Sequence, residues 1–304
     1  MILTKITRRT KRLLGLDPRA SDQIQGFFNR ENIRSLASKP VLSDFDNLSF
    51  HNPSKEIQER FVGTSFDNTF TQAARFLNHL FENQYTRGIP DKFGELRILD
   101  FGCGWGRMLR LMRSKKELDS TRLYGCDPLR VALEICRRSL PDVYISPCRL
   151  YPPSDYRDGM FDIIYAYSVF SHLSEECHLA WASEFARILQ PGGTVCLTTQ
   201  PRNLIEVCSD YRSGKRKIET AWHQGLSESF CEPDAFAKYD AGEMLYSATG
   251  GGDTLENEAY GEAIVPKRFF EKQWSAFGFE LLNWWEPPEH LDQIRVFLRK
   301  SAKS

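Results

Sequence analysis

Glycines and an acid follow one short apolar segment at a spacing that could hold a ligand. The apolar residues around Ile98 predict a buried strand, and Asp100 stands at its carboxyl end. Gly102, Gly104 and Gly106 follow, ahead of a helical pattern of apolar residues. Glycine lets the backbone approach a ligand closely and adopt positive φ without steric cost. A strand, a glycine turn and a helix in this order predict a ligand site at one edge of an open α/β sheet.

A second acid ends the next predicted strand. Residues 122–127 are mostly apolar and end in Asp127, and Pro128 suits the first turn of a helix that runs to about Ser139. A proline and two glycines at 191–193 predict a turn that ends a later helix. Further strands are predicted at 143–145, 161–167 and 194–198. Alternating strands and helices favour a parallel sheet.

The glycine spacing separates two classes of cofactor. A dinucleotide fingerprint has the spacing Gly-x-Gly-x-x-Gly, whereas this turn reads Gly-x-Gly-x-Gly with an acid two residues before it. With the later segments "FDIIYAYSVFSHL" and "FARILQPGGTVCLT", the turn resembles the motifs of class I S-adenosylmethionine-dependent methyltransferases over about 85 to 200. Residues 263–299 resemble the last helix and hairpin of that family. The resemblance implies S-adenosylmethionine as the cofactor.

The same resemblance implies the fold and its division. The expected fold is α/β and Rossmann-like, a seven-stranded, mostly parallel sheet with helices on both faces and an antiparallel last strand. Residues 1–60 are expected to form an N-terminal helical extension, and residues 61–304 the methyltransferase domain. Between about 200 and 262 lies an insertion, interpreted as a long loop without regular strands. It would emerge where ligands bind in open α/β folds, so we expect a substrate lid that is mobile without ligand.

The segment before the first strand predicts a helix, because apolar residues recur at helical spacing from Phe66 to Leu80. Its candidate caps are Asp67, Asn68 and Thr69. Just ahead of it, Phe61–Thr64 resembles a segment that closes over the amino-acid end of the cofactor in related methyltransferases.

The resemblance implies cofactor contacts for named residues. Asp100 is expected to orient the methionine end, and Gly102 and Gly104 to permit close backbone approach. Asp127 is expected to hold both ribose hydroxyls, because a carboxylate offers two acceptor oxygens. The other expected cofactor contacts are Cys103, Pro128 and Tyr167. Residues 146–150 would lie along the adenine edge, where related enzymes often place an acid and this chain has Ser-Pro-Cys, so the adenine contact stays open.

His172 is the leading candidate for a general base. Transfer of a methyl group to a hydroxyl needs a group that removes the proton, and imidazole titrates near neutral pH. A packing or helix-start histidine is the alternative interpretation. The reserve candidates for the base are His223, Asp253 and Glu262. Trp105 either covers the sulfonium by a cation–π contact or packs the first helix of the sheet.

Composition and one missing motif argue against nucleic acid as the methyl acceptor. The 40 basic and 40 acidic residues balance, which argues against a surface built for nucleic acid. No Asn-Pro-Pro-Tyr tetrapeptide follows the fourth strand. The segments "DFGCGWGR", "YSVFSHL" and "TGGG … YGEA" together resemble bacterial methyltransferases linked to the modification of surface glycans or small molecules. This resemblance implies O-methylation of a hydroxyl on a small molecule or a glycan. The alternatives are a nicotinamide-dependent dehydrogenase and a non-catalytic scaffold with a methyltransferase fold.

Cysteine usage and the charged segments indicate the compartment. Eight cysteines without a C-x-x-C pair predict free thiols and a cytoplasmic protein, and the six histidines predict no metal site. The basic first 20 residues either touch an anionic membrane surface or form a solvated terminus, and they lack the apolar run of a secretory signal. The basic run from Arg212 to Lys217 is interpreted as solvated surface, with a phosphate clamp as the alternative.

Overall fold

The computed structural model describes residues 27–39, 52–82, 93–249, 255–256, 258–287 and 293–302. The chain forms two compact units. The first, here called the N-terminal unit, comprises Met1–Leu96 and Cys103–Pro147, and the second, the C-terminal unit, comprises Arg97–Gly102 and Cys148–Ser304. The basic segment at residues 1–20 lies outside the described residues.

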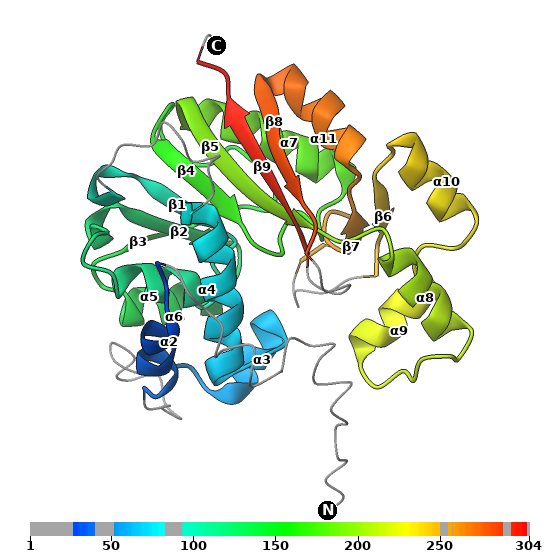
Figure 1. The fold of residues 1–304 in the computed structure, drawn as a ribbon, viewed down its shortest axis with the longest axis horizontal. Coiled ribbons are helices and arrows are strands. Elements are labelled where there is room, and N and C mark those ends of the chain that lie inside the picture. The colour runs from blue at the N-terminus through cyan, green and yellow to red at the C-terminus, as the bar shows by residue number, and fades with distance from the viewer. Residues whose placement is uncertain are drawn as a thin grey trace, which may run out of the picture. The chain divides into compact units, whose positions relative to one another are not determined.

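Seven strands follow the order β3-β2-β1-β4-β5-β9-β8 in one sheet (Figure 1). Strand β2 pairs with β3, and β4 pairs with β1 and β5, all in parallel, whereas β9 is antiparallel to β5 and β8. The strands are β1 (Ile98–Phe101), β2 (Leu123–Asp127), β3 (Tyr144–Pro147), β4 (Phe161–Ala166), β5 (Leu189–Thr199), β8 (Phe279–Trp285) and β9 (Ile294–Lys300). This topology confirms the predicted Rossmann-like fold class.

Helices surround the two strands of the N-terminal unit. They are α2 (Arg30–Ala37), α3 (Lys55–Val62), α4 (Phe66–Glu82), α5 (Arg107–Arg113) and α6 (Arg130–Ser139), with short 3-10 turns η4 (Phe93–Glu95) and η5 (Ser120–Arg122). Helix α4 buries the face predicted from its apolar spacing, including Phe70 and Leu77. Two predicted helix starts were wrong. The candidate caps at 67–69 lie inside the first turn of α4, and α6 begins two residues after Pro128.

Aromatic residues fill the core of the C-terminal unit. Helix α7 (Glu175–Ile188) and α11 (Lys267–Gln273) with the 3-10 turn η6 (Trp274–Phe277) pack around Phe170, Phe185 and Trp274. His178 is fully buried there and accepts a hydrogen bond from the Trp274 indole at 2.9 Å, and burial lowers its pKa to about 3. The proline–glycine segment at 191–193 was predicted as a turn, but β5 begins at Leu189 and includes it, with a register shift against β4.

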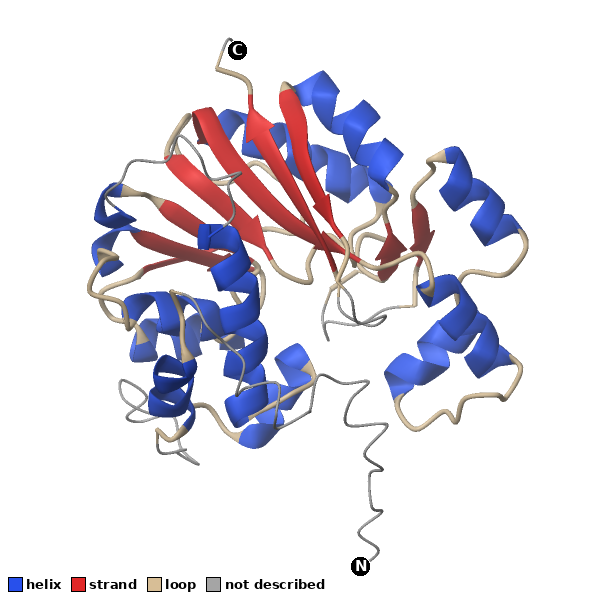
Figure 2. Cartoon of the chain, in the orientation of Figure 1, coloured by secondary structure: helices blue, strands red, loops and turns tan. Residues whose placement is uncertain are grey.

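The insertion is a small folded element rather than a loop (Figure 2). It contains α8 (Leu204–Arg212), α9 (Ala221–Glu228), α10 (Asp234–Ala241), β6 (Leu245–Ser247) and β7 (Glu262–Ile264), and β6 pairs with β7 in an antiparallel hairpin. We call residues 204–264 the helical insert. The expectation of a long loop was wrong, because the apolar residues of these short helices share a core.

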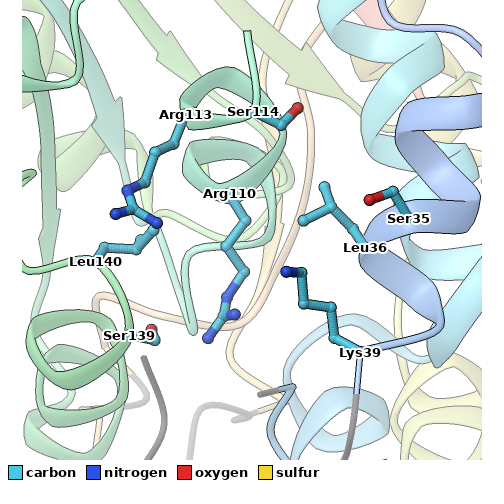
Figure 3. A pocket seen from close by; sticks show the side chains of 8 residues that line it. All are labelled: Ser35, Leu36, Lys39, Arg110, Arg113, Ser114, Ser139 and Leu140. Carbon is cyan, nitrogen blue, oxygen red and sulfur yellow. The ribbon is translucent and has the colours of Figure 1, made fainter. Parts of the chain in front are cut away.

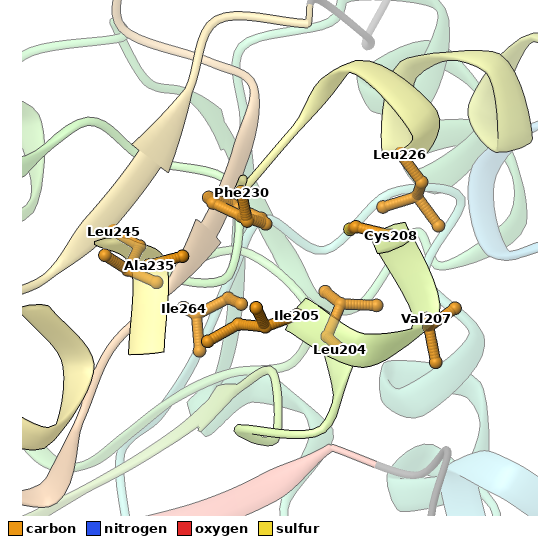
Figure 4. Packing of buried hydrophobic residues seen from close by; sticks show 9 residues of the cluster. All are labelled: Leu204, Ile205, Val207, Cys208, Leu226, Phe230, Ala235, Leu245 and Ile264. Atoms are coloured by element: carbon orange, nitrogen blue, oxygen red, sulfur yellow. The ribbon is translucent and has the colours of Figure 1, made fainter. Parts of the chain in front are cut away.

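That core holds the helical insert together (Figure 4). Its buried members are Leu204, Ile205, Val207, Cys208, Leu226, Phe230, Ala235, Leu245 and Ile264. Residues from all three helices and from both strands of the hairpin therefore contact one another. A shared core of this kind gives the insert stability of its own, unlike a loop that is ordered by ligand alone.

The basic side chains of residues 212–217 form hydrogen bonds and ion pairs with neighbouring residues. Arg212 donates to the carbonyl oxygens of Ser227 and Ser229. The next cations, Lys215 and Arg216, lie 3.6 and 3.3 Å from Asp210, and Lys217 lies 3.5 Å from Glu219. These contacts favour the interpretation as solvated surface over a phosphate clamp.

Candidate functional site

The glycine turn leaves open space at one of its three glycines. A Cβ on Gly102 would lie 2.4 Å from Val169, and one on Gly106 would lie 2.9 Å from both Cys136 and Leu140. Packing against neighbouring protein therefore accounts for those two glycines. Among the described residues, a Cβ on Gly104, whose φ is +52°, would meet Phe61 alone within 4 Å, at a distance of 3.5 Å. Gly104 is thus the glycine of the turn at which a ligand could approach the backbone.

Asp127, the last residue of β2, is hydrogen-bonded to the glycine turn. Its Oδ2 accepts a hydrogen bond from the Gly104 N–H and its Oδ1 accepts one from the Leu129 N–H, both at 2.9 Å. The side chain is 6 % exposed, and burial raises its pKa to about 6, against the effect of these two N–H donors. Each carboxylate oxygen can accept a second hydrogen bond. The carboxylate could therefore bind two neighbouring hydroxyl groups of a ligand.

Other predicted residues of the turn have structural neighbours. The Cys103 N–H donates to the Cys126 carbonyl at 3.0 Å, and Pro128 is half-buried after Asp127. Phe61 belongs to the segment that resembles the one closing over the cofactor in related methyltransferases. It lies near the end of α3, beside Gly104.

Trp105 is a packing residue. It is fully buried, its ring meets Phe70 of α4 edge-on at 5.7 Å, and the Arg110 guanidinium lies 5.5 Å from its centre. Its indole N–H is buried and has no hydrogen-bond partner among the described residues. Since no face of the ring is exposed, the structure supports the packing interpretation over a cation–π cover.

A separate cationic pocket of about 180 Å³ lies in the N-terminal unit (Figure 3). Arg110, Arg113 and Ser114 of the α5 region line it, with Ser35, Leu36, Lys39, Ser139 and Leu140. Arg113 also pairs with Asp142 at 2.6 Å. The residues of the predicted site are not among those that line this pocket.

Strands β1 and β4 place two predicted residues in the C-terminal unit. Asp100 lies one residue before the end of β1, with 3 % of its surface exposed and in register with Tyr165 of β4. Tyr167 follows β4 directly and is half-buried. The sequence therefore located both residues at the carboxyl ends of adjacent parallel strands, where α/β folds bind ligands.

Ser168 holds a left-handed backbone conformation at the start of the loop after β4. Its φ is +59°, which costs a residue with a side chain about 1–2 kcal/mol. Its N–H donates to Thr198 Oγ1 at 2.7 Å, and its hydroxyl accepts from Gln293 Nε2 at 3.0 Å. Strain retained in this way is typical of functional sites, and sequence reasoning missed this residue because backbone conformation leaves no signal in a serine.

His172 lies four residues further along this loop with a defined orientation. Its Nδ1 is 2.8 Å from the Gly261 carbonyl oxygen, which can only accept, so Nδ1 carries the proton of the neutral ring. Its Nε2 is then an acceptor, 3.5 Å from the Ser168 hydroxyl. The ring stacks on Tyr260 at 5.2 Å, and the side chain is 18 % exposed. In the neutral form of the ring, Nε2 is therefore the nitrogen that can take a proton.

Glu262, a reserve candidate in the sequence, lies beside His172. Its Oε1 is 3.5 Å from His172 Nδ1 and accepts a hydrogen bond from the Trp222 indole at 2.9 Å. The side chain is 4 % exposed, and its Oε2 is buried without a hydrogen-bond partner among the described residues. Burial raises the pKa of Glu262, while His172 and Trp222 act in the opposite direction.

Backbone hydrogen bonds explain why these residues meet. The Gly261 N–H donates to the His172 carbonyl and the Ala263 N–H donates to the Ser171 carbonyl, both at 2.8 Å. The Ser174 N–H donates to the Ala259 carbonyl at 3.0 Å. The end of the helical insert therefore runs along the loop after β4. This pairing spans about 90 residues of sequence, and no local pattern predicts it.

The two other reserve candidates lie elsewhere or outside the described residues. His223 stacks on Tyr211 at 4.8 Å, and its Nδ1 accepts from the Glu219 N–H at 3.2 Å. Burial lowers the pKa of His223. Asp253 lies outside the described residues.

Three further properties bear on the class of protein. All eight cysteines are free thiols. The described residues contain no group of three or more histidine, cysteine or acidic side chains that could hold a metal ion. Of the helices that the structure describes, none combines the length and the apolar character that crossing a membrane requires.

The chain matches a known family model over its central segment. Residues 98–193 match the methyltransferase domain. A solved S-adenosylmethionine-dependent methyltransferase from Mesorhizobium loti aligns with 17 % identity and a TM-score of 0.48, over 71 % of this chain and 95 % of its own. Magnesium protoporphyrin IX methyltransferase from Synechocystis, solved with bound SAH, aligns with 12 % identity and a TM-score of 0.49, over 84 % and 91 %.

The matched segment includes β1, the glycine turn, Asp127 and the loop that carries His172. Together with the Gly-x-Gly-x-Gly spacing, this match decides against a nicotinamide-dependent dehydrogenase. Residues 98–193 are therefore similar to the methyltransferase domain, and the elements of the predicted site lie in and around this segment.

Proposed function

We propose that this chain is an S-adenosylmethionine-dependent methyltransferase that methylates a hydroxyl group on a small molecule or a glycan. The observation that carries the proposal is the orientation of His172, whose Nδ1 faces the Gly261 carbonyl, so that Nε2 is the acceptor of the neutral form of the ring. A hydroxyl needs a general base before it can attack, whereas an amine or a thiol can do without one. A base of this kind fits oxygen as the acceptor atom.

The residues around the turn fit the cofactor. Bound S-adenosylmethionine supplies a methyl group on a positively charged sulfur, which an aligned nucleophile can displace. We propose that Asp127 accepts from both ribose hydroxyls with its remaining lone pairs, and that Gly104 provides the open backbone face. Support for this comes from the space at Gly104 and from the buried, singly used oxygens of Asp127.

The remaining cofactor contacts are proposals that rest on position in the chain. Asp100 and Gly102 precede the open glycine, and we propose that Asp100 orients the methionine end. Cys103 and Pro128 flank Gly104 and Asp127, and Tyr167 follows the neighbouring strand. We propose that Cys103, Pro128 and Tyr167 line the cofactor.

On the acceptor side, His172 accepts the hydroxyl proton on Nε2 while Gly261 holds Nδ1–H and Tyr260 fixes the plane of the ring. The Ser168 hydroxyl, 3.5 Å from Nε2, marks the side from which an acceptor hydroxyl would approach. The proton then leaves through His172 to solvent, because its side chain is partly exposed.

The test is a transfer assay with labelled methyl donor. The enzyme is incubated with S-adenosylmethionine labelled in the methyl group and a panel of monosaccharides, alkyl glycosides, phenols, amines and thiols. We expect label on oxygen, as an ether that resists mild base. Label confined to the amines or thiols would overturn the proposal.

His172→Ala provides the second arm of this test. With the first hydroxyl acceptor found, turnover should fall about a hundredfold, in line with general-base catalysis. Calorimetric affinity for S-adenosylhomocysteine should be retained. Glu134→Gln is the control, because that exposed acid of α6 pairs with Arg138. Equal turnover in the two variants would remove His172 from the mechanism.

A further inference from the structure

Glu262 connects an exposed side chain of the helical insert to the proposed base. Its Oε1 accepts from Trp222 Nε1 and lies 3.5 Å from His172 Nδ1. We propose that Glu262 is a positioning residue that acts through His172, and that Trp222 holds Glu262 in place. The inference rests on the proposed role of His172 as the base.

Two acceptors share the Nδ1 side of the imidazole, and they differ in charge. The Gly261 carbonyl, at 2.8 Å, is neutral and fixes which ring nitrogen carries the proton. The Glu262 carboxylate, at 3.5 Å, carries charge when ionised, so its attraction for the ring grows when Nε2 takes up a proton. Gly261 therefore sets the orientation, and Glu262 stabilises the imidazolium that forms as the acceptor loses its proton.

Trp222 contributes through its N–H rather than through burial. The side chain is 48 % exposed on α9, so packing alone does not fix it. Its indole N–H donates to Glu262 Oε1 and so holds that oxygen toward His172. A hydrogen bond to a charged acceptor also favours the ionised carboxylate. Phenylalanine at this position would keep an aromatic ring and lose the donor.

Among the described residues, two other titratable groups near this pair have pKa values that burial raises. From β6, Tyr246 lies near Gly261, and burial raises its pKa to about 12. From α8, Cys208 acts electrostatically on Glu262, and burial raises the pKa of that thiol to about 12 as well. The phenol of Tyr260 and the hydroxyl of Ser168 complete the surroundings of the ring. Glu262 is the acid that forms an ion-pair contact with His172, at 3.5 Å from Nδ1.

Diethyl pyrocarbonate tests the coupling without any methyl acceptor, because it acylates the unprotonated nitrogen of imidazole. The full-length protein is treated at pH values from 5 to 8, and the peptide that carries His172 is quantified by mass spectrometry. In Glu262→Gln the pH of half-maximal reaction should fall by about one unit relative to the wild type, the lower end of the effect of an opposite charge at this distance. In Trp222→Phe it should fall by a smaller amount.

Two matched controls separate this role from loss of fold. Trp284→Phe removes an indole that donates to Glu286 at 2.8 Å on β8, and Glu258→Gln removes an exposed acid four residues before Glu262. Both should react like the wild type. If Glu262→Gln does not fold, the exposed Trp222→Phe variant carries the test alone.

Failure of this inference is distinguishable from failure of the proposed function. An unchanged reaction midpoint in Glu262→Gln, or in Trp222→Phe when that variant alone is measured, overturns the inference and leaves His172 as the base. A shifted midpoint together with full methyl transfer by His172→Ala would overturn the base instead. With a hydroxyl acceptor, turnover is also measured against pH, and in Glu262→Gln its acid limb should shift by the same amount as the pH midpoint of acylation. An acid limb at the wild-type pH would overturn the positioning role.

Discussion

Asp127→Asn removes the carboxylate at the end of β2 while it keeps the size of the side chain. Both oxygens of Asp127 accept a backbone N–H, from Gly104 and from Leu129. The amide of asparagine has one oxygen, so it satisfies one of these donors and turns its own NH₂ toward the other. Two ribose hydroxyls would lose a charged acceptor, at about 1.5 kcal/mol each, which predicts a weakening of S-adenosylhomocysteine binding by about a hundredfold.

The pH dependence of binding follows from the same carboxylate. Burial raises the pKa of Asp127 to about 6, and hydroxyl donors bind the ionised form. Affinity should therefore be constant above pH 6 and fall about tenfold for each unit below it. For folding the sign is opposite, because the raised pKa means that ionisation costs the folded state free energy. That contribution, about 3 kcal/mol, is fully present below pH 4 and is lost as the pH rises to 6.

Isothermal titration calorimetry with S-adenosylhomocysteine from pH 5 to pH 8 measures both effects. The wild type should show the acid limb and Asp127→Asn should show weak binding without it. Glu134→Gln is the control, since that acid is 56 % exposed on α6 and pairs with Arg138. A wild-type affinity that does not change between pH 5 and pH 7, or an Asn variant that binds as tightly as the wild type, would refute the ribose assignment.

Two further predictions concern the turn and the helical insert. Gly104→Ala should cost about 1 kcal/mol of folding free energy, because the φ of this residue is positive. It should nevertheless weaken S-adenosylhomocysteine binding more than tenfold, as measured by calorimetry. Gly106→Ala should lower the melting temperature further, because its Cβ would lie 2.9 Å from neighbouring side chains. Leu226→Ala should cost about 2–5 kcal/mol of the insert's stability, since the side chain is fully buried, and hydrogen exchange should show α8 to α10 protected without any ligand. Exchange of these amides at the rate of an unfolded chain would mean that the core in Figure 4 does not hold them.

Local patterns in the sequence predicted most strands and the glycine turn, and they failed where packing decides. The three glycines look alike in the sequence, but Val169 and Cys136 fill the space beside two of them and leave Gly104 open. Those neighbours come from other elements, so spacing alone could not distinguish the glycine that faces a ligand.

The helical insert shows a second limit. Its helices are eight or nine residues long, too short for a clear helical period, and their apolar residues make sense only as one shared core. The pairing of Glu262 with His172 depends on that core, because the insert returns the chain to the loop after β4. Glu262, which the sequence offers as an alternative base, thereby lies 3.5 Å from His172, the leading candidate for the base.

The position of these groups divides the chemistry between two parts of the chain. The turn with Gly104 and Asp127 is built from short-range elements, β2 and the starts of α5 and α6. The groups on the Nδ1 side of His172 and the ring stacked on it belong to the helical insert, namely Tyr260, Gly261 and Glu262 with Trp222. If the cofactor binds at the turn and the acceptor binds at His172, changes in the insert should alter which hydroxyl is methylated without altering affinity for S-adenosylhomocysteine. In that case acceptor specificity would depend on the core that holds the insert together.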